Sequence, residues 1–150
     1  MPYYFAHGSN MSQRQMKERC KEGKFKTLGR AFLKGYRLVF DGYSITRKGP
    51  VANLVPSEGS IVWGVLYEVS EKCLEELDGW EGVSSGAYKR VKVEVHSEDG
   101  KSFMAYTYLR EPLEEGKPSR KYIKTLLEGA EAVGLPEEYV NKYIRVHLEG

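Results

Sequence analysis

A polar turn that follows directly on an apolar run near the N-terminus has the residue types that bind an anion. Residues from Tyr3 to Ala6 are apolar or aromatic, and Gly8, Ser9 and Asn10 come soon after them. Glycine tolerates a positive φ, and Ser and Asn side chains hold a bend by local hydrogen bonds, so several backbone N–H groups can point toward one place. We expect a short buried strand and a loop that holds an anion or oxyanion. The plain alternative is a turn with no further role.

A second candidate lies far downstream, in the stretch from Asp78 to Arg90. One acidic residue, Glu81, stands there among glycines and beside Trp80. The helix predicted before it ends at Asp78 and Gly79, so the plain interpretation places Glu81 on a solvated turn. Two separate stretches of the chain therefore contain candidate functional residues.

The two stretches together resemble the paired signatures of the gamma-glutamylcyclotransferase family. They read Tyr-Phe-Ala-His-Gly-Ser-Asn over residues 4–10 and Glu-Gly-Val-Ser-Ser-Gly-Ala-Tyr over residues 81–88. Further similar segments follow in order along the chain, at residues 62–66, 118–122 and 134–139. The resemblance spans nearly the whole chain and implies a single domain over residues 1–150.

The resemblance implies an enzyme that converts a gamma-glutamyl amino acid to 5-oxoproline and a free amino acid, a reaction of glutathione metabolism. The substrate's own α-amine attacks its γ-carbonyl, so holding the reactive conformer contributes on the order of several kcal/mol. Neither water nor a cofactor is consumed. The protein must supply a base for the α-ammonium proton and N–H donors for the charge that grows on the γ-oxygen.

In this reading Glu81 is the catalytic base, because partial burial beside Trp80 would raise its pKa from about 4.3 toward the working range. The backbone N–H groups from His7 to Asn10 are the expected donors. Tyr88 is expected to bind the substrate or Glu81, and Tyr122 to close the far side of the pocket. The full set of expected substrate-binding residues is Tyr4, Phe5, Ala6, His7, Gly8, Ser9, Asn10, Tyr88 and Tyr122.

His7 departs from the family pattern, which carries Tyr at this place. A lone histidine there is expected to orient the loop rather than to catalyse, and it can shift the pH profile. The preference among different gamma-glutamyl substrates therefore stays open.

Two alternatives to the dipeptide enzyme remain. Relatives with this fold act on gamma-glutamyl amines such as gamma-glutamyl-lysine, and the same pocket could belong to a module that binds a gamma-glutamyl ligand without catalysis. The form Glu-Gly-Val-x-Ser-Gly-x-Tyr favours the dipeptide enzyme. Only an enzyme needs a base at Glu81, so that residue separates catalysis from binding.

Composition restricts the partners. The chain has 23 Lys and Arg against 21 Asp and Glu, a net charge of +2 without basic clustering, which argues against a nucleic-acid partner. No stretch approaches the roughly 20 apolar residues of a membrane span, and no leader pattern opens the chain. We therefore expect a cytoplasmic protein with a small-molecule substrate, and a homodimer stays open.

No cofactor or metal is expected. His7, His96 and His147 are far apart in the sequence, and no Gly-x-Gly-x-x-Gly or P-loop pattern occurs. Cys20 and Cys73 lack C-x-x-C spacing, and two cysteines are too few for a disulfide scaffold, so both are interpreted as structurally unimportant helix residues.

The predicted elements place strands in the middle of the chain and helices at its edges, which indicates an α+β domain around a curved or closed sheet. The resemblance implies, more narrowly, a small mixed β-barrel flanked by short helices. Residues 46–50 form a basic connection without an evident function. The expected helices are 11–22, 71–77, 119–133 and 136–143, and the expected extended segments are 3–6, 25–45, 52–55, 61–69, 88–95 and 102–109, with a turn at 56–60.

Overall fold

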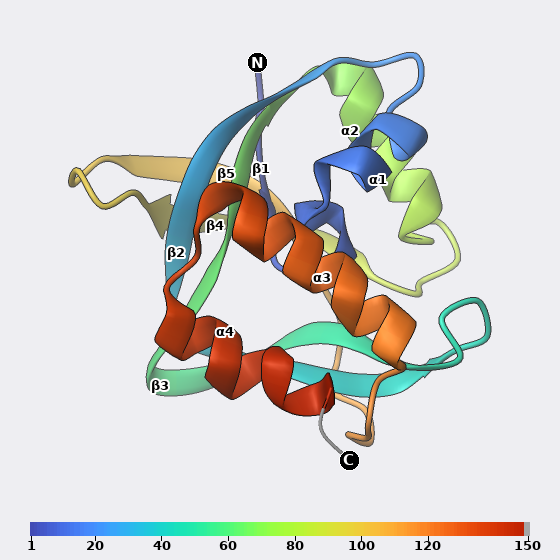
Figure 1. Cartoon of the computed structure of the whole chain (residues 1–150). Coiled ribbons are helices and arrows are strands. Elements are labelled where there is room, and N and C mark those ends of the chain that lie inside the picture. Colours follow the sequence, from blue (N-terminus) through green and yellow to red (C-terminus); the bar gives the residue numbers. More distant parts are fainter. Residues whose placement is uncertain (149–150) are drawn as a thin grey trace.

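A closed barrel of five strands, with helices packed around it, organises the computed structural model, which describes residues 1–148 (Figure 1). The α+β class and the small mixed barrel are thereby confirmed. The strands are β1 (Tyr3–Ala6), β2 (Phe25–Ser44), β3 (Gly49–Val69), β4 (Lys89–His96) and β5 (Ser102–Leu109). The helices are α1 (Gln13–Arg19), α2 (Glu71–Trp80), α3 (Arg120–Val133) and α4 (Glu137–Tyr143), with 3-10 turns η1 (Ser9–Met11) and η2 (Arg145–Leu148). No helix within residues 1–148 is long and apolar enough to cross a membrane.

The shortest strand, β1, closes the barrel. It pairs antiparallel with β3 and parallel with β5, so both of its edges are hydrogen-bonded. Phe5 is fully buried, as the apolar start of the chain predicted. Gly64 of β3 lies so close that a Cβ atom there would be 2.3 Å from the carbonyl oxygen of Ala6. The loop that follows β1 therefore leaves the barrel from a fixed point.

The strands β2 and β3 form one long bent hairpin, and the turn predicted at residues 56–60 is wrong. β3 runs unbroken through these residues. Lys34 pairs with Ile61 and Tyr36 pairs with Pro56, so two steps along β2 are matched by five along β3. The extra residues of β3 form an irregular bulge, because β2 continues to supply pairing partners on both sides of it.

Serine caps begin three helices. The Oγ atoms of Ser12, Ser70 and Ser119 accept hydrogen bonds from the N–H groups of Gln15, Cys73 and Tyr122 at 3.1–3.2 Å. Gly134 ends α3 with a φ of 66°, the left-handed conformation that glycine adopts easily.

Two helix details differ from the prediction. α1 ends at Arg19 rather than Glu22, and α2 continues through Asp78 and Gly79 to Trp80. Its last turn holds because the N–H of Glu81 donates to the carbonyl oxygen of Leu77 at 2.9 Å. Glu81 therefore occupies the C-cap of α2, directly on the end of a packed helix.

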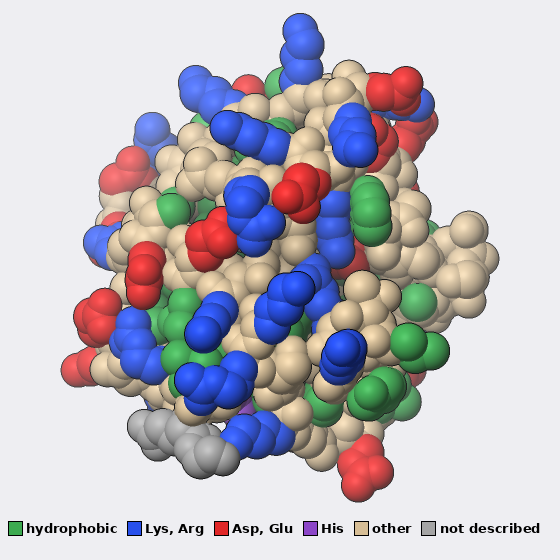
Figure 2. All heavy atoms as spheres, turned by 45° about the vertical axis from the view of Figure 1, so that its right-hand side comes forward, with side chains coloured by type: hydrophobic (Ala, Val, Ile, Leu, Met, Phe, Trp, Pro, Cys, Tyr) green, Lys and Arg blue, Asp and Glu red, His purple; other side chains and the backbone are tan. Residues whose placement is uncertain are grey.

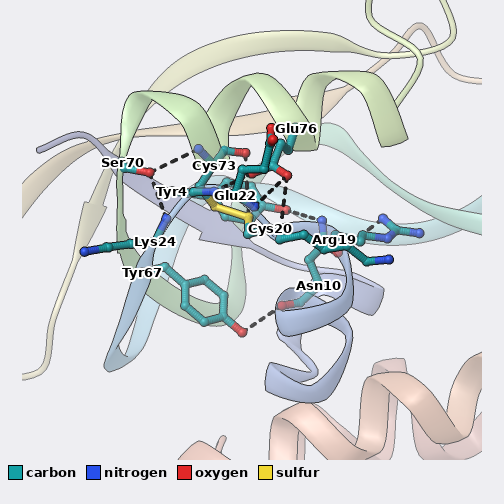
Figure 3. Close-up of a disulfide and its surroundings, with 12 residues drawn as sticks. Tyr4, Asn10, Arg19, Cys20, Glu22, Lys24, Tyr67, Ser70, Cys73 and Glu76 are labelled. Carbon is teal, nitrogen blue, oxygen red and sulfur yellow. Dashed lines mark hydrogen bonds between the residues drawn. A yellow bond between two sulfur atoms is a disulfide. The ribbon is translucent and has the colours of Figure 1, made fainter.

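A disulfide joins Cys20, at the end of α1, to Cys73 in α2 (Figure 3). The interpretation of both cysteines as structurally unimportant is therefore wrong. Tertiary packing brings the two Cα atoms to 4.9 Å although 53 residues separate them, and closing such a loop restricts the unfolded chain by roughly 4 kcal/mol. The Glu76 carboxylate also accepts the N–H groups of Lys21, Glu22 and Gly23. α1 and α2 are thus held together at the edge of the barrel.

Helix α3 presses on the loop after β1. A Cβ atom on Gly129 would lie 2.2 Å from the carbonyl carbon of Met11, so only glycine lets the two backbones meet. From the barrel side, the hydroxyl of Tyr67 donates to the carbonyl oxygen of Asn10 at 2.7 Å. The loop is therefore fixed from two directions.

This contact reverses an ordinary expectation for glycine in a helix. Gly→Ala in a helix interior usually stabilises by up to about 1 kcal/mol. We expect Gly129→Ala to lower the free energy of unfolding by roughly 1–3 kcal/mol, as overpacking does, because the new methyl group meets backbone. Gly79→Ala in α2 is the matched control, since a Cβ atom there meets nothing within 4 Å. Urea unfolding of both variants measures the difference, and a Gly129→Ala protein as stable as Gly79→Ala would contradict the close packing.

Candidate active site

A cavity of about 900 Å³ opens beside the loop after β1. Helix α1, the end of α2, the β2–β3 turn, the start of β4, the end of β5 and the first turn of α3 supply the other walls. Its lining includes eight of the ten site residues expected from the sequence: Tyr4, His7, Gly8, Ser9, Asn10, Glu81, Tyr88 and Tyr122. Phe5 and Ala6 are not among the lining residues and are buried within β1.

Glu81 is a partly buried carboxylate in this cavity. Burial raises its pKa above the ordinary value, and the positive charges of Arg19, Arg47 and Arg110 oppose this shift. Trp80 is 58% exposed and its ring lies 5.0 Å from the guanidinium of Arg19, so it shields Glu81 less than the sequence suggested. The raised pKa agrees with the sequence-based expectation, but the burial comes from the cavity walls as a whole.

The loop contains glycine for a reason other than the one expected. Gly8 has a φ of −121°, so positive φ is not what it provides. A Cβ atom on Gly8 would instead lie 3.0 Å from Ala52 Cβ and 3.4 Å from the hydroxyl of Tyr122. The N–H groups of Met11 and Ser12 donate to Gly8 and Ser9 carbonyl oxygens. The N–H groups that precede Met11 lie at the start of η1. Helical geometry leaves donors at this end without an internal hydrogen-bond partner.

Arginine fixes the direction of the hydrogen bonds beside this loop. Arg47 Nη2 donates to Gln15 Oε1 at 2.5 Å and to Ser9 Oγ at 3.3 Å. Because a guanidinium can only donate, Gln15 Oε1 must face Arg47, and Gln15 Nε2 donates to Ser9 Oγ at 2.7 Å. Ser9 Oγ thus accepts two bonds, so its own O–H is left as a donor. The Gln15 side chain therefore supports the loop.

A second chain of hydrogen bonds reaches Tyr4. Arg19 Nη1 and Gln15 Nε2 both donate to Asn10 Oδ1, and Asn10 Nδ2 donates to the Tyr4 hydroxyl at 2.8 Å. The Tyr4 oxygen is an acceptor in this bond, and its proton remains to be donated. Burial, followed by the nearby Glu81 charge, raises the Tyr4 pKa, so Tyr4 is a neutral donor beside the carboxylate.

Two tyrosines hold the backbone of Ala52 opposite the loop. The Tyr88 hydroxyl donates to the Ala52 carbonyl oxygen at 2.9 Å, and the Ala52 N–H donates to the Tyr122 hydroxyl at 2.9 Å. Tyr88 therefore keeps only acceptor capacity for a ligand, whereas Tyr122 keeps its proton. Burial raises the pKa of Tyr122 to about 12, so this donor persists at neutral pH. Arg110 lies 4.6 Å from the Tyr88 ring and supports it.

The buried His7 side chain is held by the barrel. Its Nε2 lies 2.8 Å from the carbonyl oxygen of Tyr108, which can only accept, so Nε2 carries the proton. Burial lowers the pKa of His7 to about 4, and the ring is neutral at pH 7. This geometry suits a loop-orienting role.

The cavity lining also includes Gln15, Arg19 and Arg47, which were not expected there from the sequence. Arg47 lies in the basic connection at residues 46–50, which was the one available signal. The folding of the β2–β3 turn over the loop gives it a place in the cavity. Within residues 1–148, no three His, Cys, Asp or Glu side chains lie close enough to hold a metal ion together.

Comparison with known proteins gives consistent matches. Residues 61–143 match the model of the AIG2-like family. Gamma-glutamylcyclotransferase from Homo sapiens is 35% identical over 143 residues, which cover 93% of this chain and 75% of the relative. The Mus musculus protein of the same name is 33% identical over the same shares. A solved structure named gamma-glutamyl cyclotransferase superposes with a TM-score of 0.87 at 34% identity, covering 94% of this chain and 85% of that one.

The matches to the two mammalian proteins each cover 93% of this chain. The structural match covers nearly all of this chain as well. The chain therefore belongs to the gamma-glutamylcyclotransferase family.

Proposed function

We propose that the protein converts gamma-glutamyl amino acids to 5-oxoproline and a free amino acid. The observation that carries the proposal is the arrangement of Glu81, a carboxylate whose pKa is raised by burial, in one cavity with the N–H groups and the hydroxyl of the Gly8–Asn10 loop. The names of the relatives support the same reaction.

The reaction needs one proton carrier. The α-ammonium gives a proton to the Glu81 carboxylate, and the freed amine attacks the γ-carbonyl carbon, so that a C–N bond forms and negative charge moves to the γ-oxygen. As the original amide C–N bond breaks, the departing nitrogen takes the proton from Glu81. The ring nitrogen gives up its second proton to Glu81, and Glu81 passes this proton on to the departing amine. The products are 5-oxoproline and the free amino acid in its ammonium form, and the carboxylate is regenerated.

The polar groups of the cavity suit the two substrate groups whose charge changes during the reaction, the γ-oxygen and the α-ammonium. The loop N–H groups and the Ser9 O–H are donors, which suit the γ-oxygen as it becomes negative. The Tyr88 oxygen and Glu81 are acceptors, which suit the α-ammonium. In this assignment, the donors bind the γ-oxygen and the acceptors bind the α-ammonium.

The direct test is incubation of the purified protein with gamma-glutamyl dipeptides, gamma-glutamyl-lysine and glutathione, with 5-oxoproline measured by chromatography. Formation from dipeptides supports the proposal. Formation from gamma-glutamyl-lysine alone would favour the amine enzyme, and calorimetric binding without product would favour the ligand-binding module.

Glu81→Gln should lower kcat by about 100- to 10,000-fold with a nearly unchanged KM, because the amide keeps the size of the side chain but cannot accept the proton. The raised pKa of Glu81 also sets the pH dependence of the wild-type protein. The active form is the carboxylate, so activity should rise with pH, with a midpoint above the ordinary glutamate pKa of about 4.3. Initial rates measured across pH test the variant and the wild-type profile. A variant with more than about a third of wild-type activity would remove Glu81 as the base.

The loop should depend on its backbone more than on one hydroxyl. Ser9→Ala removes a single donor and should cost roughly tenfold in kcat/KM. Gly8→Val places a branched side chain against Ala52 and should cost about 100-fold or more, because small displacements of a reactive site are costly. Circular dichroism controls for the fold. If folded Gly8→Val protein is as active as wild type, this turn is only a turn.

A further inference from the structure

Arg47 extends from the β2–β3 turn into the cavity wall with part of its guanidinium unused. Its carbon Cζ lies 5.4 Å from the ring centre of Tyr122. Both hydrogen bonds of the side chain come from Nη2, to Gln15 and Ser9. Within residues 1–148, the Nε and Nη1 donors have no protein acceptor, so each can donate to an oxygen of an anion.

Arg47 also lacks an ion-pair partner among the described residues. Arg110 is paired with the fully buried Asp41 at 2.7 Å. Arg19 and Arg47 have no Asp or Glu partner within 4.0 Å in residues 1–148, and each lies close enough to oppose the raised pKa of Glu81. Burial and the charge of Arg19 lower the pKa of Arg47, so an anion beside it would be strongly favoured. Figure 2 shows Lys and Arg side chains scattered among Asp and Glu side chains over the face that it presents.

The two arginines match the two carboxylates of a gamma-glutamyl amino acid. One substrate carboxylate shares a carbon atom with the α-ammonium, and the other belongs to the amino acid beyond the amide that breaks. Arg19 lies 5.0 Å from the ring of Trp80, the residue next to Glu81, so Arg19 is placed for the carboxylate beside the α-ammonium. Arg47 is then left for the second carboxylate. A gamma-glutamyl amine would leave Arg47 without a partner.

We infer that Arg47 binds the carboxylate of the released amino acid and thereby selects gamma-glutamyl amino acids over gamma-glutamyl amines. This inference rests on the proposed function and adds a specificity-determining residue to it. The carboxylate is present in both the ground state and the transition state, so Arg47 acts mainly on KM.

The test compares gamma-glutamyl-alanine with gamma-glutamyl-alaninamide, which has the same shape without the second charge. Wild-type protein should prefer the carboxylate by roughly 10- to 100-fold in kcat/KM. Arg47→Gln should bring this ratio to about one, mainly by raising the KM for gamma-glutamyl-alanine. Arg37→Gln, an exposed arginine on β2 that is 4.0 Å from Glu115, is the matched control and should keep the wild-type ratio.

The ratio separates recognition from support of the loop. If Arg47 only held Gln15 and Ser9, its loss would slow both substrates equally and leave the ratio unchanged, which would overturn the inference. A wild-type ratio near one would overturn it as well.

Binding to the Glu81→Gln protein tests Arg47 without turnover. Calorimetry should show the same 10- to 100-fold preference for gamma-glutamyl-alanine, and its loss in Glu81→Gln/Arg47→Gln. If wild-type protein makes no 5-oxoproline but this preference is present, the proposed function fails and the role of Arg47 stands. Equal binding of the two ligands overturns the role of Arg47 whatever the activity.

Discussion

Pairing of β1 on both of its edges is the constraint on which the site depends. A four-residue strand cannot hold its position alone, but between β3 and β5 its backbone is hydrogen-bonded on each side and its side chains are buried. The loop that follows therefore starts from a fixed point. Gly64, Gly129 and Gly8 then let neighbouring backbone or side chains approach the strand and loop at distances that a Cβ atom would prevent.

Arg19 and Arg47 determine which groups donate and which accept hydrogen bonds in the polar wall of the cavity. A hydroxyl or a side-chain amide can be oriented either way, but Arg19 and Arg47 only donate, so the groups that they touch must accept. Asn10 and Gln15 pass this direction on to Tyr4 and to the Ser9 hydroxyl. The result is a preorganised set of donors, which needs no rearrangement when negative charge develops on a substrate.

The elements that carry these charges are tied to one another. The disulfide and the Glu76 carboxylate hold the end of α1 to α2, so Arg19 and Glu81 are supported by the same pair of helices. The buried pair of Arg110 and Asp41 holds the opposite wall, where Tyr88 lies under the guanidinium. The same connected elements therefore bury Glu81, which raises its pKa, and carry the arginines that oppose this shift.

From the sequence alone, the capped helices, the buried first strand, the family and the two signature stretches were predictable, because each depends on neighbouring residues or on a pattern that survives divergence. Other features required the tertiary structure. The course of β3 through residues 56–60 depends on pairing with β2, and the disulfide depends on packing that brings Cys20 to Cys73 across 53 residues. Likewise, only the folded β2–β3 turn brings Arg47 to Ser9, because no local pattern relates residues so far apart in the chain.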